Sequence, residues 1–269
     1  MNLAKRLLVV FVVVPPFAFL VYKGGWGYSL FWTFFSGVAG WELWRIFKNG
    51  GYTPSRLILI LGPPLLVMTR FLFGFEYADG FITLLMFVIL FFHIYAYEKG
   101  LPKAGISFLI TIGGLMYLGW LSGYFISLRS LQNGHWWSYL SLVAIWAADS
   151  GGYIVGSLIG KHKLARKISP KKTVEGYLGG ILFGVVFTGV FAYFFHNAAP
   201  EITIQRGLLL GLIISIVAPM GDLGESIIKR QFGVKDSSKI LPGHGGIMDR
   251  IDSWLWGIPL CYYLIYWLW

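Results

Sequence analysis

The 269-residue chain is 57% hydrophobic, 18% aromatic and only 13% charged, and it carries a net charge of +10 at pH 7. A soluble domain cannot bury that much apolar surface, so the composition predicts an all-α, polytopic integral membrane protein. It leaves no soluble basic face for nucleic acid, and the single cysteine, Cys261, excludes both an internal disulfide and a cysteine zinc site.

About nine apolar segments are long enough to cross a membrane, which takes roughly 17 to 25 residues each. The first segment follows Lys5 and Arg6 and lacks a small-residue cleavage site, so we expect a retained span and not a signal peptide. The expected spans are residues 5–22, 26–46, 56–74, 79–97, 103–125, 137–159, 174–195, 205–221 and 251–269.

Lysine and arginine residues gather on alternate connections between these spans. Of the 22, 18 lie on the side that holds the N-terminus and 4 on the other. Because cytoplasmic loops retain an excess of Lys and Arg, we expect a cytoplasmic N-terminus and cytoplasmic loops at 160–173 and 221–250. The expected location is the cell inner membrane, with the active site facing the cytoplasm.

The two halves of the chain differ in their polar residues. Residues 1–135 hold almost nothing ionisable inside their spans and are predicted to form a transmembrane scaffold, whereas 136–269 form the catalytic region. Glu42, His93 and Glu98 lie near span ends, where solvation at the membrane interface is the simpler explanation. Glycines that recur every fourth residue in the sixth and seventh spans predict close helix packing.

Two carboxylates of the second half lie within or beside predicted spans. Asp149 falls about halfway along the sixth span, where a carboxylate costs several kcal/mol unless it meets a cation, a proton or water. It therefore predicts a polar cavity, and a structural hydrogen bond to a neighbouring helix is the alternative. Glu175 is expected to pair with a lysine or to contact a metal ion.

The basic segment 161–173 has two interpretations. Ser169 followed by Pro170 is typical of a helix start, with the serine as cap and the proline in the first turn. A helix N-terminus that also carries Lys171 and Lys172 is a ready site for an anion. The alternative is a positively charged anchor on the cytoplasmic side.

A polar stripe follows Pro219, which we expect to end one helix and begin another. Asp222, Glu225, Ser226 and Lys229 recur at helical spacing, so they share one face of the second helix. An interfacial helix lying on lipid headgroups is the alternative, but it would favour lysines over two carboxylates.

Asp249 and Asp252 are three residues apart, which places both carboxylates on one helical face. Like charges held so close repel, and a divalent cation relieves the repulsion; oxygen ligands point to Mg²⁺. The residues just upstream allow backbone amides, and one imidazole, to approach phosphate: Gly243, His244, Gly245 and Gly246.

The block from Ser226 to Asp252 resembles the signature of the phosphatidate cytidylyltransferase family, the CDP-diacylglycerol synthases. It contains Ser-x-x-Lys-Arg, Lys-Asp, Pro-Gly-His-Gly-Gly and Asp-Arg-x-Asp in order. The stretch from Asp149 to Gly176 is similar to a second family region, with Ser150 where threonine is expected. The likeness covers roughly residues 140–255, and a motif spread over so many positions is far more specific than a short pattern.

The resemblance implies transfer of a cytidylyl group from CTP to phosphatidic acid, which gives CDP-diacylglycerol and pyrophosphate. Mg²⁺ is the implied cofactor, with a second cation of unknown identity left open. The residues expected in catalysis are Asp222, Lys229, Arg230, His244 and Asp249. Those expected to bind substrate are Lys171, Lys172, Ser226, Lys235, Lys239, Gly243, Gly245, Gly246 and Arg250. The expected metal ligands are Asp149, Asp222, Asp249 and Asp252.

The expected partners are CTP, phosphatidic acid from the inner leaflet and the surrounding membrane lipids, with a homodimer left open and no nucleic acid. Two other functions fit parts of the sequence. A CTP-dependent lipid or polyprenol kinase would release CDP in place of pyrophosphate. An ion-coupled transporter would also bury acids and break helices with proline, but it needs no glycine-rich basic loop.

Overall fold

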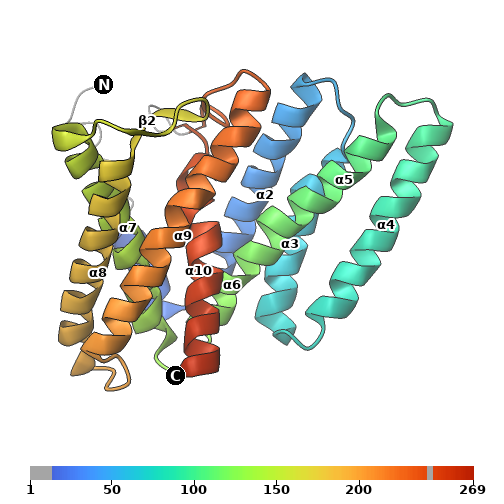
Figure 1. Ribbon diagram of the computed structural model, residues 1–269. Helices are drawn as coiled ribbons and strands as arrows, with labels where there is room; N and C mark the ends of the chain where they lie inside the picture. Colours follow the sequence, from blue (N-terminus) through green and yellow to red (C-terminus); the bar gives the residue numbers. More distant parts are fainter. Residues whose placement is uncertain (1–13, 241–244) are drawn as a thin grey trace. The chain divides into compact units, whose positions relative to one another are not determined.

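The structure, a computed structural model, describes residues 14–240 and 245–269 and is almost entirely helical (Figure 1), which confirms the all-α membrane-protein class. The chain forms two compact units. The N-terminal unit comprises Met1–Arg129 and Asp236–Met248, and the C-terminal unit comprises Ser130–Lys235 and Asp249–Trp269. The segment Asp236–Met248 thus groups with the N-terminal helices, although the sequence analysis placed it in the C-terminal half.

The N-terminal unit begins in the described part with a helical segment at residues 14–23. Its further elements are α2 (Gly25–Asn49), α3 (Arg56–Phe73), α4 (Ala78–Glu98), α5 (Ala104–Gly114), the π-helix η1 (Leu115–Trp120) and α6 (Leu121–Arg129), the last three forming one continuous helix. A Cβ atom on Gly40 of α2 would overlap the carbonyl of Leu59 in α3, so these two helices are in backbone contact.

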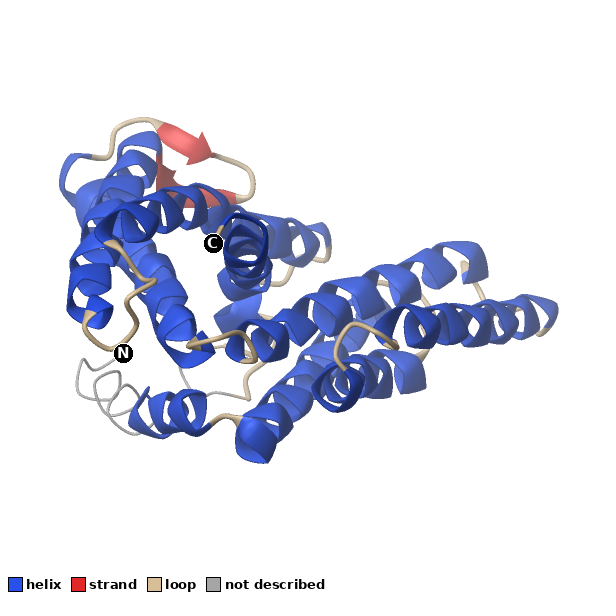
Figure 2. Ribbon diagram, turned by 90° about the horizontal axis from the view of Figure 1, so that it is seen from below, coloured by secondary structure: helices blue, strands red, loops and turns tan. Residues whose placement is uncertain are grey.

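The C-terminal unit contains four long helices and a short hairpin (Figures 1 and 2). They are α7 (Gly134–Ile159), β1 (Lys163–Ala165), β2 (Ser169–Thr173), α8 (Val174–His196), α9 (Ile204–Gln231) and α10 (Met248–Leu268), of which Met248 falls in the N-terminal unit. The strands pair antiparallel, with Lys163 opposite Thr173 and Ala165 opposite Ser169.

Glycines bring α7 and α8 into contact, as the four-residue repeats predict. A Cβ atom on Gly180 would lie 2.6 Å from the carbonyl oxygen of Ala148, and one on Gly176 would lie 2.7 Å from that of Gly152. No larger side chain fits at these positions without moving a helix. The contact fixes the part of α7 that carries the mid-span Asp149, the residue after Ala148.

Six helices in the described part of the chain are long and apolar enough to cross a membrane by length and composition. They are α3, α4, the continuous helix Ala104–Arg129, α7, α8 and α9. The expected spans 26–46 and 251–269 fold as α2 and α10 but are not among the six. Half of the first expected span lies outside the described residues, so nine spans and a cytoplasmic N-terminus remain predictions.

The helix start predicted at Ser169 and Pro170 is wrong, because both residues belong to β2. The helix begins instead at Val174, where the Thr173 side chain accepts a hydrogen bond from the amide of Gly176. Pro170 is tolerated because a two-stranded hairpin leaves outward-facing positions that need no amide donor. The two lysines predicted at a helix N-terminus therefore lie on a strand.

The helix break predicted at Pro219 is also wrong, because α9 continues through it from Ile204 to Gln231. Proline removes one helical hydrogen bond, and side chains from neighbouring elements bind the carbonyls around it. The Tyr177 hydroxyl donates to the carbonyl of Ile216 at 2.7 Å, and Lys172 Nζ donates to that of Pro219 at 3.3 Å. Residues 221–231 are helical, as the polar stripe predicts, but they continue α9 and do not form a separate cytoplasmic helix.

Two polar residues expected to be solvated at span ends are instead buried. His93 is 4% exposed, and its Nε2 lies 3.0 Å from Thr111 Oγ1. Glu42 is fully buried, with hydrogen-bond donors from the segment Asp236–Met248 around it. Each is buried because a polar partner lies within the same unit, and Glu98 at the end of α4 is exposed as expected.

We predict that Gly180→Ala destabilises the protein because its new methyl group collides with the Ala148 carbonyl. The expected loss is about 1–3 kcal/mol, seen as a lower melting temperature in detergent. The matched control is Gly113→Ala in α5, where a Cβ atom meets nothing within 4 Å. That control should be neutral or gain up to about 1 kcal/mol through helix propensity, and equal melting shifts would contradict the packing account.

Candidate active site

A buried lysine joins α9 to α10 in the C-terminal unit. Lys229 Nζ donates to Asp249 Oδ1 at 2.6 Å and lies 3.1 Å from Glu225 Oε1 in the preceding turn of α9. The side chains of Lys229 and Asp249 are each 7% exposed, and that of Glu225 is fully buried. An ammonium group so far from water requires these two anionic partners, since an unpaired buried charge is strongly unfavourable.

A second ion pair joins the hairpin to α9. Lys172 Nζ of β2 lies 2.7 Å from Asp222 Oδ2, and both side chains are partly exposed. Asp222 Oδ1 also accepts a hydrogen bond from Ser226 one turn along α9, at 3.3 Å. The structure confirms the predicted stripe, because Asp222, Glu225, Ser226 and Lys229 share one face of a single helix.

Asp252 lies one turn beyond Asp249 on α10, as predicted, and is 8% exposed. The α9 and α10 backbones meet beside it, because a Cβ atom on Gly221 would lie only 2.5 Å from the Asp252 carbonyl oxygen. The Asp252 carboxylate accepts from the Ser253 amide at 2.6 Å and interacts electrostatically with Asp222 and Glu225. Carboxyl groups thus face each other across the two helices.

Asp149 is exposed on α7 and extends the same charge network. Its electrostatic neighbours are Lys172, Asp222 and Arg250. The mid-span acid therefore belongs to a group of charges contributed by α7, β2, α9 and α10, and we call these eight residues the acidic cluster. Its members are Asp149, Lys172, Asp222, Glu225, Lys229, Asp249, Arg250 and Asp252.

The cluster suits a divalent cation by charge and by donor chemistry. Its five carboxylates outnumber its three cations, so two negative charges remain when all are ionised, which one divalent ion would balance. All the anionic donors are oxygens, the ligands that Mg²⁺ prefers. Within residues 14–240 and 245–269, no three acidic, His or Cys side chains are spaced to hold a metal ion as they stand. The set Asp149, Asp222, Asp249 and Asp252 therefore remains a prediction.

Other predicted site residues have different surroundings. Arg230 donates to the carbonyls of Ile168 and Val234, at 3.2 and 3.1 Å, so it fixes the hairpin turn and the end of α9. Three lysines proposed as phosphate contacts are exposed: Lys171, Lys235 and Lys239. Gly245 has a left-handed φ of 82°, whereas Gly243 and His244 lie outside the described residues.

Glu175 does not pair with a lysine. Its carboxylate accepts from the amides of Lys161 and His162 and lies 2.5 Å from the His162 ring, so it closes the base of the hairpin. Glu225 was recognised only as part of the helical stripe and was not assigned to the site. The burial of Glu225 beside Lys229 depends on the packing of α10. A short sequence pattern within α9 contains no information about that packing.

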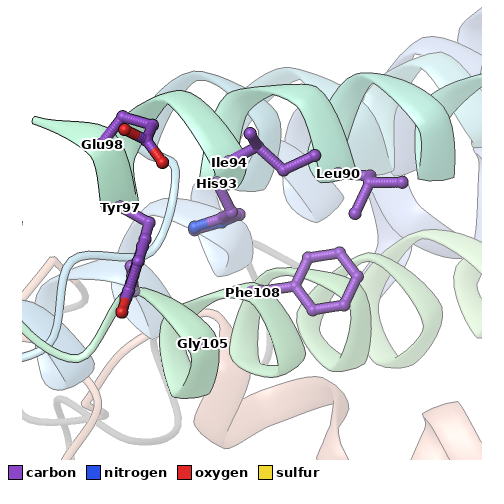
Figure 3. A pocket seen from close by; sticks show the side chains of 8 residues that line it. Leu90, His93, Ile94, Tyr97, Glu98, Gly105 and Phe108 are labelled. Carbon is purple, nitrogen blue, oxygen red and sulfur yellow. The ribbon is translucent and has the colours of Figure 1, made fainter.

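A cavity of about 240 Å³ lies between α4 and α5 in the N-terminal unit (Figure 3). Most of its lining is aliphatic and aromatic, including Leu90, Ile94 and Phe108, with His93 and Glu98 at the polar end. None of the residues predicted from the sequence to carry chemistry lines this cavity, so the acidic cluster is the candidate active site.

We predict that Lys229→Met destabilises the protein more than Lys172→Met. Removing Lys229 leaves Glu225 and Asp249 buried without their cation, which costs about 3–5 kcal/mol. The Lys172 pair is partly exposed, so its loss should cost about 1 kcal/mol or less. Thermal denaturation in detergent measures both variants, and similar shifts would contradict the assigned difference in burial.

Comparison with known proteins agrees with the resemblance seen in the sequence. The model of the cytidylyltransferase family matches residues 4–268. A protein of Bacillus subtilis named phosphatidate cytidylyltransferase is 36% identical over 275 residues, covering 98% of each chain. A protein of the same name from Synechocystis is 34% identical, and the match covers 91% of this chain and 90% of that protein. Another, from Staphylococcus haemolyticus, is 44% identical, and the match covers 60% of this chain and 61% of that protein. This chain therefore belongs to the cytidylyltransferase family.

Proposed function

We propose that this protein transfers the cytidylyl group of CTP to phosphatidic acid, forming CDP-diacylglycerol and pyrophosphate. The observation that carries the proposal is the match to phosphatidate cytidylyltransferases along nearly the whole chain, 36% identical over 98% of its length in one relative. The acidic cluster supports it, because Lys229, Asp249 and Asp252 of the family signature come from two helices of one unit and interact with one another. Asp149 of the second family region interacts in turn with Arg250.

The reaction requires two anions to meet. A phosphate oxygen of phosphatidic acid forms a bond to the α-phosphorus of CTP, while the bond from that phosphorus to the bridging oxygen breaks and pyrophosphate departs. The attacking phosphate has a second pKa of about 6, so it is largely dianionic at neutral pH and needs no base to activate it. Catalysis then rests on positioning the two substrates and on stabilising negative charge.

Two lysines of the acidic cluster fit the task of binding phosphate. Lys172 on β2 and Lys229 on α9 each hold a carboxylate, so substrate phosphates can exchange places with those carboxylates. Asp222 and Asp249, once released, would hold Mg²⁺ together with Asp252 and Asp149. The ion would supply neutralisation of charge on the α-phosphate and on the departing pyrophosphate. A second cation is part of the proposal, because the cluster has more carboxylates than one hydrated Mg²⁺ requires.

The proposed setting is the inner membrane, with the acidic cluster open to the cytoplasm. The excess of lysine and arginine on the side that holds the cluster supports this orientation. In that arrangement CTP arrives from the cytosol and phosphatidic acid enters laterally from the inner leaflet. The homodimer that the sequence leaves open is not part of this proposal.

The decisive assay supplies the purified protein with CTP, Mg²⁺ and phosphatidic acid in mixed micelles. We expect pyrophosphate and CDP-diacylglycerol to appear in equal amounts, and chelation of Mg²⁺ to stop both. Asp249→Asn should lower kcat by about 100-fold or more, since it weakens the binding of the ion that would stabilise transition-state charge. Asp79→Asn, on an exposed first-turn residue of α4, is the matched control and should retain activity.

Each alternative predicts a different outcome, in this assay or in a flux assay with liposomes. Release of CDP without pyrophosphate would overturn the proposal in favour of a lipid kinase. Substrate flux across liposomes without either product would favour a transporter. A melting curve for Asp249→Asn shows whether the folded protein persists, which separates lost chemistry from lost structure.

A further inference from the structure

Glu42 of α2 is a fully buried carboxylate that the proposed reaction does not use. It lies in the N-terminal unit together with the two described arms of the glycine-rich loop, residues 236–240 and 245–248. We call these the loop arms. The sequence placed Glu42 at a span end, yet every hydrogen bond described for its carboxylate comes from the loop arms.

Four donors converge on the Glu42 carboxylate. From the first arm, the hydroxyl of Ser237 donates at 3.0 Å and that of Ser238 at 2.5 Å. From the second arm, the backbone amides of Ile247 and Met248 donate at 3.0 and 2.8 Å. A carboxylate has about four acceptor positions, so these donors satisfy it completely. One side chain thereby fastens both ends of the loop.

Neighbouring residues make this attachment specific. Arg45, one turn further along α2, donates to the carbonyl of Ser237 at 3.0 Å. A Cβ atom on Gly246 would overlap both Ser237 Oγ and the Glu42 carboxylate, so only glycine allows the second arm to approach. Hydrogen bonds to charged side chains and the close approach at Gly246 therefore hold the loop arms against α2.

The attachment also begins a helix. Met248 is the first residue of α10, and the first amides of a helix lack partners inside it. Glu42 accepts two hydrogen bonds at this end and places a negative charge there, which the helix dipole favours. The next residue along the chain is Asp249, a predicted metal ligand.

We propose that Glu42 is a positioning residue for the nucleotide: it holds the loop arms and the start of α10 in the arrangement that binds CTP phosphates. This inference rests on the proposed function. The loop arms carry Lys239, Gly245 and Gly246, which are expected to bind substrate phosphates. Losing the Glu42 contact loosens these groups without removing any that touch substrate.

The test compares Glu42→Gln with the wild type in the full-length, purified protein. Glutamine keeps the shape of the side chain, but its NH₂ group faces the serine hydroxyls or the backbone amides of the loop arms, which are themselves donors. At least one hydrogen bond to the charged carboxylate is therefore lost. We expect the KM for CTP to rise roughly tenfold while the KM for phosphatidic acid stays within about twofold, because hydrogen bonds to charged groups are worth about that much. Ser238→Ala removes one donor from the loop side and should shift the KM for CTP in the same direction, but less.

Hydrogen exchange provides a readout that does not depend on catalysis. The Ile247 and Met248 amides should exchange at least about tenfold faster in Glu42→Gln, as expected when a protecting hydrogen bond weakens. Glu98→Gln, on an exposed glutamate at the end of α4, is the matched control and should alter neither readout. If the wild type makes no CDP-diacylglycerol, the proposed function fails while exchange still tests the attachment. An active wild type with unchanged KM for CTP in Glu42→Gln, or activity lost only in proportion to unfolded protein, would overturn the inference.

Discussion

The contact of Lys229 with the carboxylates of Glu225 and Asp249 is the constraint on which the C-terminal unit depends. All three side chains are almost completely buried, so none can be left without its partner at an acceptable free energy. Satisfying them requires α9 and α10 to approach closely, and Gly221 permits that approach by presenting no side chain to the Asp252 backbone. The position of the other acids on both helices follows from this contact.

The remaining charges make the cluster suited to exchanging partners. Lys172 and Lys229 pair with Asp222 and Asp249 in this structure, and Asp252 interacts with Asp222 and Glu225 as well as with Lys229. Phosphate groups and a divalent cation together match this set, since phosphates suit the lysines and the cation suits the carboxylates. If only the phosphate groups or only the cation were bound, some charged side chains of the cluster would lack a charge of opposite sign nearby. We infer that the nucleotide and its metal ion bind as one unit.

The sequence predicted the parts of the fold that local patterns encode. The shared face of Asp222 and Lys229 follows from helical spacing, and the packing of α7 on α8 follows from glycines four residues apart. The hairpin was missed because Ser169 and Pro170 suit a helix start equally well. Two features make this segment a strand and not a helix start: it pairs with residues 163–165, and Thr173 caps the helix that follows. Neither feature can be inferred from the Ser-Pro dipeptide.

The burial of Glu42 could not be predicted for a related reason. Its hydroxyl donors lie 195 and 196 residues further along the chain, and no local pattern reports a contact at that separation. Predicting which acids bind metal met the same difficulty, because Asp149, Asp222 and Asp252 come from three helices. Span depth, helical spacing and the family signature located these three residues, whereas the structure supplies the pairing of Asp222 with Lys172.

The central claim is that the surplus carboxylates of the acidic cluster bind a divalent cation together with the nucleotide. Electron paramagnetic resonance with Mn²⁺, which carboxylate and phosphate oxygens bind as they bind Mg²⁺, counts the bound ions directly. The account predicts that CTP strengthens Mn²⁺ binding to the full-length protein, and that Asp249→Asn combined with Asp252→Asn abolishes it. Equal Mn²⁺ binding by the wild type and this double variant in the presence of CTP would contradict the account.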